Sequence, residues 1–531
     1  MSLMENLTPL LVGLIVLSLA ICGQFFRRNA TSGLPPGPKP LPLFGNIRDL
    51  PAQGIPEYQH WIKFKDMYGP ISSVSILGQQ MILLHDKKAA HDLLEQKSLK
   101  TSLRPSSFFA NQCGFGNFLP FRQYDETYRW HRKLLHQQIG TKVMSARFNE
   151  VQDLESRRLL LRVLKKPEDL TNHFKTEASA IVLKITYGYA IEPRTHDPLV
   201  SLVERMMDNM SLALVPLAWI VDILPILNHL PEGFPGTSFK TQAREWNQVN
   251  QTVTDAPFKF VRRQLAAGTH RTSYVSQLIE KYGTGKHGEL ELSLEQENAI
   301  KQTAAILYGG GADTTVSTLC SFVLAMVMFP DVQQKAQEEI DKVIGDERLP
   351  DFSDRHQLPY VNALVSETLR WLPVTPVGTP HVTDDEIVYN GFSIPKGTYL
   401  VPAIWWFLHD PETYANPSDF DPDRYLEPRN EPEPTTESFG YGRRICPGRY
   451  LAMESLFITV SRILAAFHIS KAIDADGEEV EATLQPTAGL ICHPKPFPYI
   501  IVPRTEKHAE LILSVEREHP WETSDAESLK L

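Results

Sequence analysis

The first marked pattern along the chain is an apolar run from Leu7 to Phe26 that contains no charged residue. A helix of about 20 such residues spans a bilayer. Glu5 precedes the run and Arg27 and Arg28 follow it, so the positive-inside rule places the rest of the chain in the cytosol. We therefore predict a signal anchor at 7–26 after a short lumenal segment at 1–6. A cleaved signal peptide, the alternative, would have basic residues first and a shorter apolar core.

The chain after this run divides by composition into three parts. Residues 27–40 are basic and then proline-rich, which predicts a stiff, extended hinge. A long stretch of ordinary globular composition follows at 41–504 and is predicted to form the main folded body. The segment 505–531 is rich in charge and poor in apolar residues, so we expect a flexible tail with little core material.

Helical periodicity dominates the long middle part. Val332, Ala336, Ile340 and Val343 fall on one face of a helix at 331–344. Helices are also predicted at 299–328 and 454–467, a hairpin around Gly78 within 66–86, and strands at 398–401 and 499–502. The predicted fold class is mainly α, in the α+β sense, with a large helical body and a small β region near its start, preceded by one transmembrane helix.

Charge and cysteine usage exclude two classes of protein. The 531-residue chain has a net charge of −10 and scattered Lys and Arg, so no basic stripe for nucleic acid is present. Its five cysteines are odd in number, and none stands at a C-x-x-C spacing, which argues against a disulfide framework. Four of them are interpreted as small buried apolar residues; Cys446 differs.

Cys446 lies in a loop rich in glycine, Phe439-Gly-Tyr-Gly-Arg-Arg-Ile-Cys-Pro-Gly448. Glycine permits tight turns, so backbone N–H groups and the start of the following helix can face the sulfur and favour a thiolate. A thiolate can ligate haem iron, and the fork of Arg444 suits a carboxylate such as a haem propionate. A nucleophilic cysteine is the alternative, but no specific signature supplies its histidine partner.

This loop resembles the haem-binding signature of the cytochromes P450. That signature has Phe, Gly, Arg, Cys and Gly at the spacing found here for Phe439, Gly442, Arg444, Cys446 and Gly448. The resemblance implies the cytochrome P450 fold, heme b as cofactor and Cys446 as the axial ligand of its iron. It covers nearly the whole chain and is strongest to fungal microsomal enzymes of secondary metabolism, the group similar to O-methylsterigmatocystin oxidoreductase.

A second set of matches concerns the region behind the haem. Glu367 and Arg370 share one face of a predicted helix, and an E-x-x-R pair alone is most often a surface ion pair worth about 0–1 kcal/mol. By the resemblance, these two residues and Arg424 form a buried network with a structural role.

A third match lies within the predicted helix 299–328, where Gly309, Gly310 and Gly311 are adjacent. Each glycine costs a helix about 1 kcal/mol relative to alanine. A phosphate-binding loop is the alternative, but no preceding strand or following Lys fits it. The resemblance implies a loosened helix that binds dioxygen, with Asp313 as the acid and Thr314 as the hydroxyl of a proton relay. A bond from Thr314 to the carbonyl one turn earlier is compatible with that role.

Two more residues match positions that meet the haem propionates, Arg132 and His381. The segment of Arg132 departs from the family pattern, because Tyr128 stands where Trp is usual and Trp130 lies two positions on. The aromatic contact is therefore open, while Arg132 itself matches.

The resemblance implies a monooxygenase in the endoplasmic reticulum membrane, single-pass, with its catalytic domain cytosolic and in contact with lipid. Electrons would come from NADPH through a separate NADPH–cytochrome reductase, and cytochrome b5 stays open as a further donor. Side chains such as Phe109, Phe115 and Phe118 would line an apolar pocket for a hydrophobic terpenoid, polyketide or alkaloid. Two alternatives remain: a haem-thiolate isomerase or dehydratase that needs no reductase, and a non-enzymatic membrane protein that binds haem or sterol.

Overall fold

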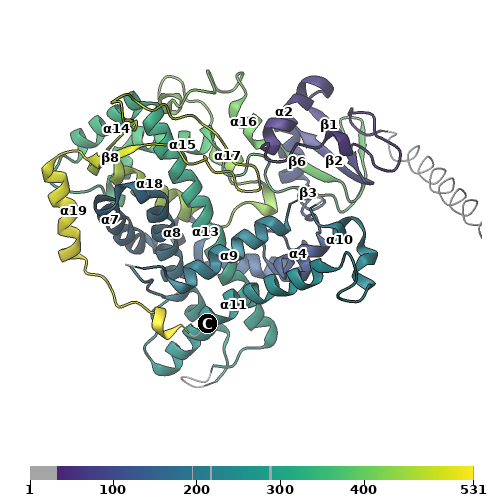
Figure 1. Cartoon of the computed structure of the whole chain (residues 1–531), viewed down its shortest axis with the longest axis horizontal. Coiled ribbons are helices and arrows are strands. Elements are labelled where there is room, and N and C mark those ends of the chain that lie inside the picture. The colour runs from purple at the N-terminus through teal and green to yellow at the C-terminus, as the bar shows by residue number, and fades with distance from the viewer. Residues whose placement is uncertain (1–32, 194, 216–217, 286–289, 530–531) are drawn as a thin grey trace, which may run out of the picture. The chain divides into compact units, whose positions relative to one another are not determined.

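The structure, a computed structural model, describes residues 33–193, 195–215, 218–285 and 290–529 (Figure 1). The chain forms two compact units. Of the described residues, those within 33–105, 377–407 and 441–444 form the smaller unit, and those within 106–376, 408–440 and 445–529 form the larger. The predicted anchor at 7–26 and the first residues of the predicted hinge lie outside the described residues.

The smaller unit is built on a four-stranded sheet. Its strand order is β1 (Ile71–Ile76), β2 (Gln79–Leu84), β6 (Tyr399–Pro402) and β3 (His381–Val382), with only the β2–β6 pair parallel. Leu77 and Gly78 join β1 to β2 with φ of 50° and 87°, as a two-residue hairpin turn requires, so the predicted hairpin is confirmed. The unit also contains η1 (Ile47–Asp49), α2 (Glu57–Tyr68), α3 (Lys87–His91), η2 (Asp92–Gln96), β4 (Ile387–Tyr389), β5 (Phe392–Ile394), η8 (Gly442–Arg444) and the start of α16 (Ile404–His409).

The described part of the proline-rich segment lies along β1. Ser73 donates from its backbone N to Pro36 O at 2.8 Å and from its hydroxyl to Pro35 O at 2.6 Å. A Cβ on Gly37 would lie 1.9 Å from Ser73 O, so only glycine permits this approach. Residues 35–37 are thereby held against the sheet.

The larger unit is helical. The predicted helix at 331–344 is α14 (Pro330–Val343), and the one at 454–467 lies within α18 (Arg449–Ala466). The remaining helices and turns are α4 (Phe108–Gln112), η3 (Phe115–Asn117), α5 (Glu126–Ile139), α6 (Lys142–Ala146), α7 (Asn149–Lys165), η4 (Pro167–Asp169), α8 (Leu170–Tyr187), α9 (Pro198–Ala213), α10 (Ile220–Ile223), η5 (Pro225–His229), α11 (Ser238–Ala267), α12 (Tyr274–Tyr282), α13 (Leu294–Met328), η6 (Phe352–Gln357), α15 (Pro359–Trp371), η7 (Pro422–Tyr425) and α17 (Thr435–Ser438).

Helix α13 is the central element of this unit. It begins with a capping box between Ser293 and Gln296 and ends just before Pro330, which starts α14. Its first half is buried in one apolar cluster and its last half in another. Within the part of the chain described, α13 is the one helix long and apolar enough to cross a membrane, yet 67% of its apolar window is buried inside the protein. Its apolar character is therefore that of a core helix.

The chain ends in more ordered structure than its composition predicts. Strands β7 (Phe467–Ser470) and β8 (Ile500–Pro503) pair antiparallel, and α19 (Glu506–Glu518) and η9 (Ala526–Ser528) follow. Ile512 and Val515 of α19 are buried, and Trp521 lies 4.8 Å from the guanidinium of Arg158. The segment after Arg504 thus contributes core material, contrary to the expectation from its charge, because its few apolar residues fall on one face.

Candidate functional site

Cys446 lies in the loop between α17 and α18. Gly440 and Gly442 have φ of 74° and 50°, a region that favours glycine. A Cβ on Gly442 would lie 2.6 Å from the carbonyl oxygen of Leu94, so this position also needs glycine for space. The backbone N of Cys446 donates to Phe439 O at 2.8 Å. The glycines of the motif therefore set the path of the loop that presents the sulfur.

The Cys446 thiol is half-buried and is not in a disulfide. Burial raises its pKa, while the backbone N–H groups of Gly448 and Arg449 and the charges of Arg132 and Arg449 lower it. Gly448 is the N-cap of α18, so the positive end of that helix adds to these effects. A cation bound at the sulfur would remove the thiol proton outright. The surroundings of Cys446 suit a thiolate held under a metal ion.

The kind of metal site follows from the absence of other ligands nearby. Across the described ranges, no three His, Cys, Asp or Glu side chains gather into a ligand set. A metal at Cys446 would thus have fewer than three such ligands from the described residues. Haem iron fits this condition, because the porphyrin supplies its equatorial ligands and one cysteine suffices on the axis.

Arg132 lies on α5 in the larger unit, as Cys446 does. The pKa of its guanidinium is lowered by burial, against the favourable charges of Tyr128 and Cys446. Tyr128, one turn earlier on the helix, is buried at 3% exposure, whereas Trp130 is only partly buried. Tyr128 rather than Trp130 therefore shares a helix face with Arg132.

Two arginines and a histidine gather in the smaller unit. Arg444 donates to Ser102 O at 2.7 Å, and Arg104 donates to the carbonyl oxygens of Thr379 and Pro380, each at 2.9 Å. His381 of β3 is buried, and its Nδ1 lies 2.8 Å from the carbonyl oxygen of Thr101.

The His381 imidazole is neutral in these surroundings. Burial holds its pKa well below the ordinary value, and the charges of Arg104 and Arg444 add to that effect. Because a carbonyl oxygen only accepts, the His381 proton is on Nδ1. An anion bound at this cluster would raise the pKa of His381, and the protonated imidazole would then donate from Nε2 as well. Arg104 belongs to no motif, and only the structure shows it beside Arg444 and His381.

The three glycines of α13 have different neighbours. A Cβ on Gly309 would lie 2.9 Å from Met207 Sδ, and one on Gly311 would lie 2.9 Å from Val182 Cγ2, whereas one on Gly310 would meet nothing within 4 Å. Two glycines thus permit close helix packing, and Gly310 faces open space. Such space beside a buried helix suits a bound group.

The helix does not loosen at these glycines, contrary to what the resemblance implies. It is continuous through 309–315, and the hydroxyls of Thr314 and Thr315 donate to the carbonyls of Gly310 and Gly311 at 2.7 and 2.8 Å. These bonds one turn back are the ordinary ones for threonine within a helix. Gly310 and Thr314 share a face, which is the face with open space.

Asp313 points to a partner that sequence reasoning missed. Its Oδ1 lies 3.3 Å from Nε2 of His493, and the two side chains are 33% and 29% exposed. His493 precedes β8 by several residues and belongs to no recognised motif. No local sequence signal links it to Asp313.

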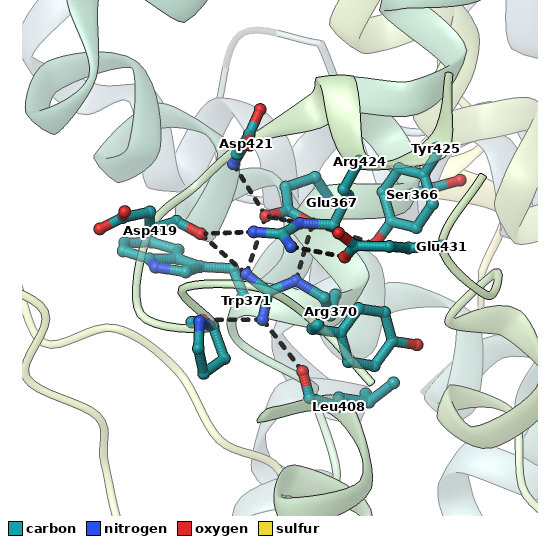
Figure 2. A network of polar contacts seen from close by, with 12 residues as sticks. Ser366, Glu367, Arg370, Trp371, Leu408, Asp419, Asp421, Arg424, Tyr425 and Glu431 are labelled. Atoms are coloured by element: carbon teal, nitrogen blue, oxygen red, sulfur yellow. Dashed lines mark hydrogen bonds and ion pairs between the residues drawn. The ribbon is translucent and has the colours of Figure 1, made fainter. Parts of the chain in front are cut away.

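Glu367, Arg370 and Arg424 are brought together with no exposed side-chain surface (Figure 2). Arg370 binds both carboxylate oxygens of Glu367, at 2.7 and 2.8 Å, and Arg424 Nε binds Oε1 at 3.0 Å. The structure adds two members, Tyr425, which donates to Glu367 at 3.0 Å, and Glu431, which accepts from Arg424 at 2.7 Å.

The aromatic side chains expected around a substrate lie in the core of the larger unit. Phe109, Phe115 and Phe118 are fully buried in the core of the larger unit. Phe109 stacks on Trp219 with ring centroids 3.5 Å apart. These three residues pack the core, so their apolar character alone does not define a pocket.

Known proteins resemble this chain over almost its full length. The sequence profile of the family Cytochrome P450 matches residues 35–501. Cytochrome P450 monooxygenase CLM2 of Gibberella zeae is 50% identical over 523 residues, 98% of this chain and 99% of that protein. Multifunctional cytochrome P450 monooxygenase af510 of Aspergillus fumigatus is 48% identical over 95% of this chain and 94% of its own.

The fungal group suggested by the motifs is also among the relatives. O-methylsterigmatocystin oxidoreductase of Aspergillus flavus is 38% identical over 93% of this chain and 92% of its own. The predicted resemblance and the mainly helical body with a small β region are confirmed. Matches of this extent show that the chain belongs to the cytochrome P450 monooxygenases, which carry haem on a cysteine thiolate and receive electrons from a reductase.

Proposed function

We propose that the chain oxidises a hydrophobic small molecule of fungal secondary metabolism, a terpenoid, polyketide or alkaloid, with Cys446 as the axial ligand of its haem. The observation that carries the proposal is the environment of Cys446, whose sulfur faces backbone N–H groups and the charge of Arg132. Relatives such as O-methylsterigmatocystin oxidoreductase support this substrate class.

Two sets of residues would hold the haem. Cys446 would bind the iron, and Phe439, Gly442 and Gly448 would shape the loop that presents it. Arg132, Arg444 and His381 would bind the propionates. This role is supported by the burial or half-burial of these three side chains, each of which is positive or can be protonated. Buried carboxylates need partners of this kind. The bound haem supplies the activation of dioxygen.

Proton delivery would be the task of Asp313 and Thr314. The Thr314 hydroxyl donates to Gly310 O at 2.7 Å, and a hydroxyl that donates once still accepts. It would take a proton from the Asp313 carboxyl while its own proton turns from Gly310 O toward the open space above the helix. A short path of this kind is what general acid catalysis requires.

The chain would work at the endoplasmic reticulum membrane. Support comes from the uncharged run at 7–26 and the two arginines after it. The segment 35–37 is held on β1, so an anchor ahead of it would have a short tether. A separate NADPH–cytochrome reductase would supply the electrons from the same membrane, with cytochrome b5 as a candidate second donor.

Replacement of the cysteine tests the haem ligand. We expect Cys446→Ser to lose the red-shifted Soret band of the reduced carbon monoxide complex, because a hydroxyl is a poor ligand in place of a thiolate. Cys492→Ser is the matched control, because Cys492 is a buried free cysteine outside the 439–448 loop. This variant should keep the band. A Cys446→Ser protein with the band would refute the assignment.

The reaction is tested by metabolite masses. Deletion of the gene in its source organism, with labelled dioxygen supplied to the parent strain, should leave a precursor lighter than the lost product by one labelled oxygen. A precursor and product of equal mass would instead identify an isomerase and refute the relay role of Asp313 and Thr314.

A further inference from the structure

We propose that His493 is a positioning residue that holds the Asp313 carboxylate for proton delivery. The inference rests on the proposed relay function of Asp313 and extends it to a residue that lies outside every motif of the chain. It starts from the contact between Asp313 Oδ1 and His493 Nε2, which lie 3.3 Å apart and form an ion pair when the imidazole is protonated.

The backbone around His493 is fixed to the helix that carries the acid. Ser317, one turn after Asp313 on α13, donates from its hydroxyl to Cys492 O at 2.5 Å. Cys492 N donates to Val374 O at 2.8 Å. The imidazole is therefore brought to the carboxylate by the main chain next to it.

A second pair of bonds fixes His493 itself. Its backbone N donates to Thr487 Oγ1 at 2.9 Å, and its carbonyl accepts from Thr487 N at 2.8 Å. An exposed ion pair normally loses most of its gain to the entropy of ordering two side chains. Here one partner stands on a fixed backbone and the other on a helix, so less of that cost remains.

The other charges around Asp313 do not replace His493. Lys175 on α8 acts, like Asp313, on the thiol of Cys320, but its ammonium is paired with Glu204 at 3.4 Å. His493 is thus the partner at contact distance. Because it engages Oδ1, Oδ2 is the oxygen left to carry a proton toward Thr314. Both side chains are about one-third exposed, so protons can be renewed from solvent.

The test needs no identified substrate. The full-length holoenzyme is supplied with NADPH and a flavin reductase, and hydrogen peroxide is measured against NADPH consumed. One NADPH and one proton reduce dioxygen to peroxide, whereas two NADPH and two protons reduce it to two waters. Poor proton delivery therefore raises the ratio of peroxide to water.

We expect His493→Leu to raise the ratio of peroxide to water about 2- to 5-fold, the range that corresponds to the loss of one partly exposed ion pair. His493→Arg, which places a permanent positive charge at this position, should restore at least half of the change. In an Asp313→Asn background, His493→Leu should add nothing, because its effect passes through that carboxylate. His468→Leu, at an exposed position of β7, is the matched control, and the reduced carbon monoxide spectrum verifies haem loading in each protein.

The outcomes separate this proposal from the one on which it rests. An equal rise in the Asp313→Asn background would show a purely structural role for His493 and overturn the inference. A shift for Asp313→Asn with none for His493→Leu would overturn it and leave the relay intact. No shift for Asp313→Asn would remove the relay itself.

Discussion

Glu367 accepts hydrogen bonds from four residues while fully buried (Figure 2). Oε1 accepts from Arg370, Arg424 and the backbone N of Asp421, and Oε2 accepts from Arg370 and Tyr425. A carboxylate has lone pairs for all of these donors and a charge that balances one of the two guanidinium groups.

Glu367→Gln keeps the shape of this side chain and removes the negative charge that balances one guanidinium group. Whichever oxygen becomes the amide NH₂ then faces at least two donors that lose their acceptor, and each unpaired buried donor costs about 1–3 kcal/mol. The change also removes the carboxylate that both arginines share. Arg424 then keeps Glu431 as its carboxylate partner. We expect a loss of about 3–5 kcal/mol in the free energy of unfolding, as for other buried pairs with one partner removed.

The assay is a urea titration of the holoenzyme, followed by the red-shifted band of its reduced carbon monoxide complex. The matched control is Glu126→Gln, because Glu126 pairs with Arg129 at 3.4 Å with its side chain 95% exposed. That change should leave the urea midpoint where it is. A midpoint for Glu367→Gln equal to that of Glu126→Gln would refute the argument that burial makes the network important.

Two further predictions concern the glycines of α13 and a buried carboxyl group. Gly311→Ala should cost about 1–3 kcal/mol because its Cβ would lie 2.9 Å from Val182. Gly310→Ala should instead raise the urea midpoint, because its Cβ meets nothing within 4 Å and alanine is favoured over glycine in a helix by about 1 kcal/mol. Equal midpoints for the two variants would contradict the packing argument. Burial raises the pKa of Glu177 from 4.5 to about 7 despite a hydrogen bond from Thr459, so the folded chain binds the proton more tightly than the unfolded chain. Stability should then fall as pH rises from 4.5 to 7. Glu177→Gln should flatten that slope in urea titrations at several pH values, and an unchanged slope would contradict the assignment.

The features that local sequence predicted are those that a short stretch of chain determines. Leu77-Gly78 forms its hairpin turn through the φ of two adjacent residues, and α14 follows from one apolar stripe that ends near Gly345. The glycines of the cysteine loop are needed for backbone path and close approach. In each case the cause lies within a few residues of its effect, so pattern and spacing are sufficient.

The features that sequence missed depend on which distant segments meet. The charge-rich segment after Arg504 was expected to lack core material, yet Ile512 and Val515 are buried because α7 packs on them. Arg104 lies beside Arg444 through the fold of the smaller unit, with no motif to mark it. The unbroken helix at 309–315 shows a different limit, since the packing of Gly309 and Gly311 against α9 and α8 supports the helix despite the cost of glycine.

Asp313 and His493 show why chemistry at this site needs both kinds of reasoning. The sequence motif identifies the acid, since Asp313 stands next to Thr314 in a helix whose glycines leave one face open. It says nothing of what holds the carboxylate, because that depends on the bonds from Ser317 to Cys492 and from Thr487 to His493. A relay requires an acid that is both near its acceptor and held in orientation. The motif provides the first condition, and we infer that the fixed backbone carrying His493 provides the second.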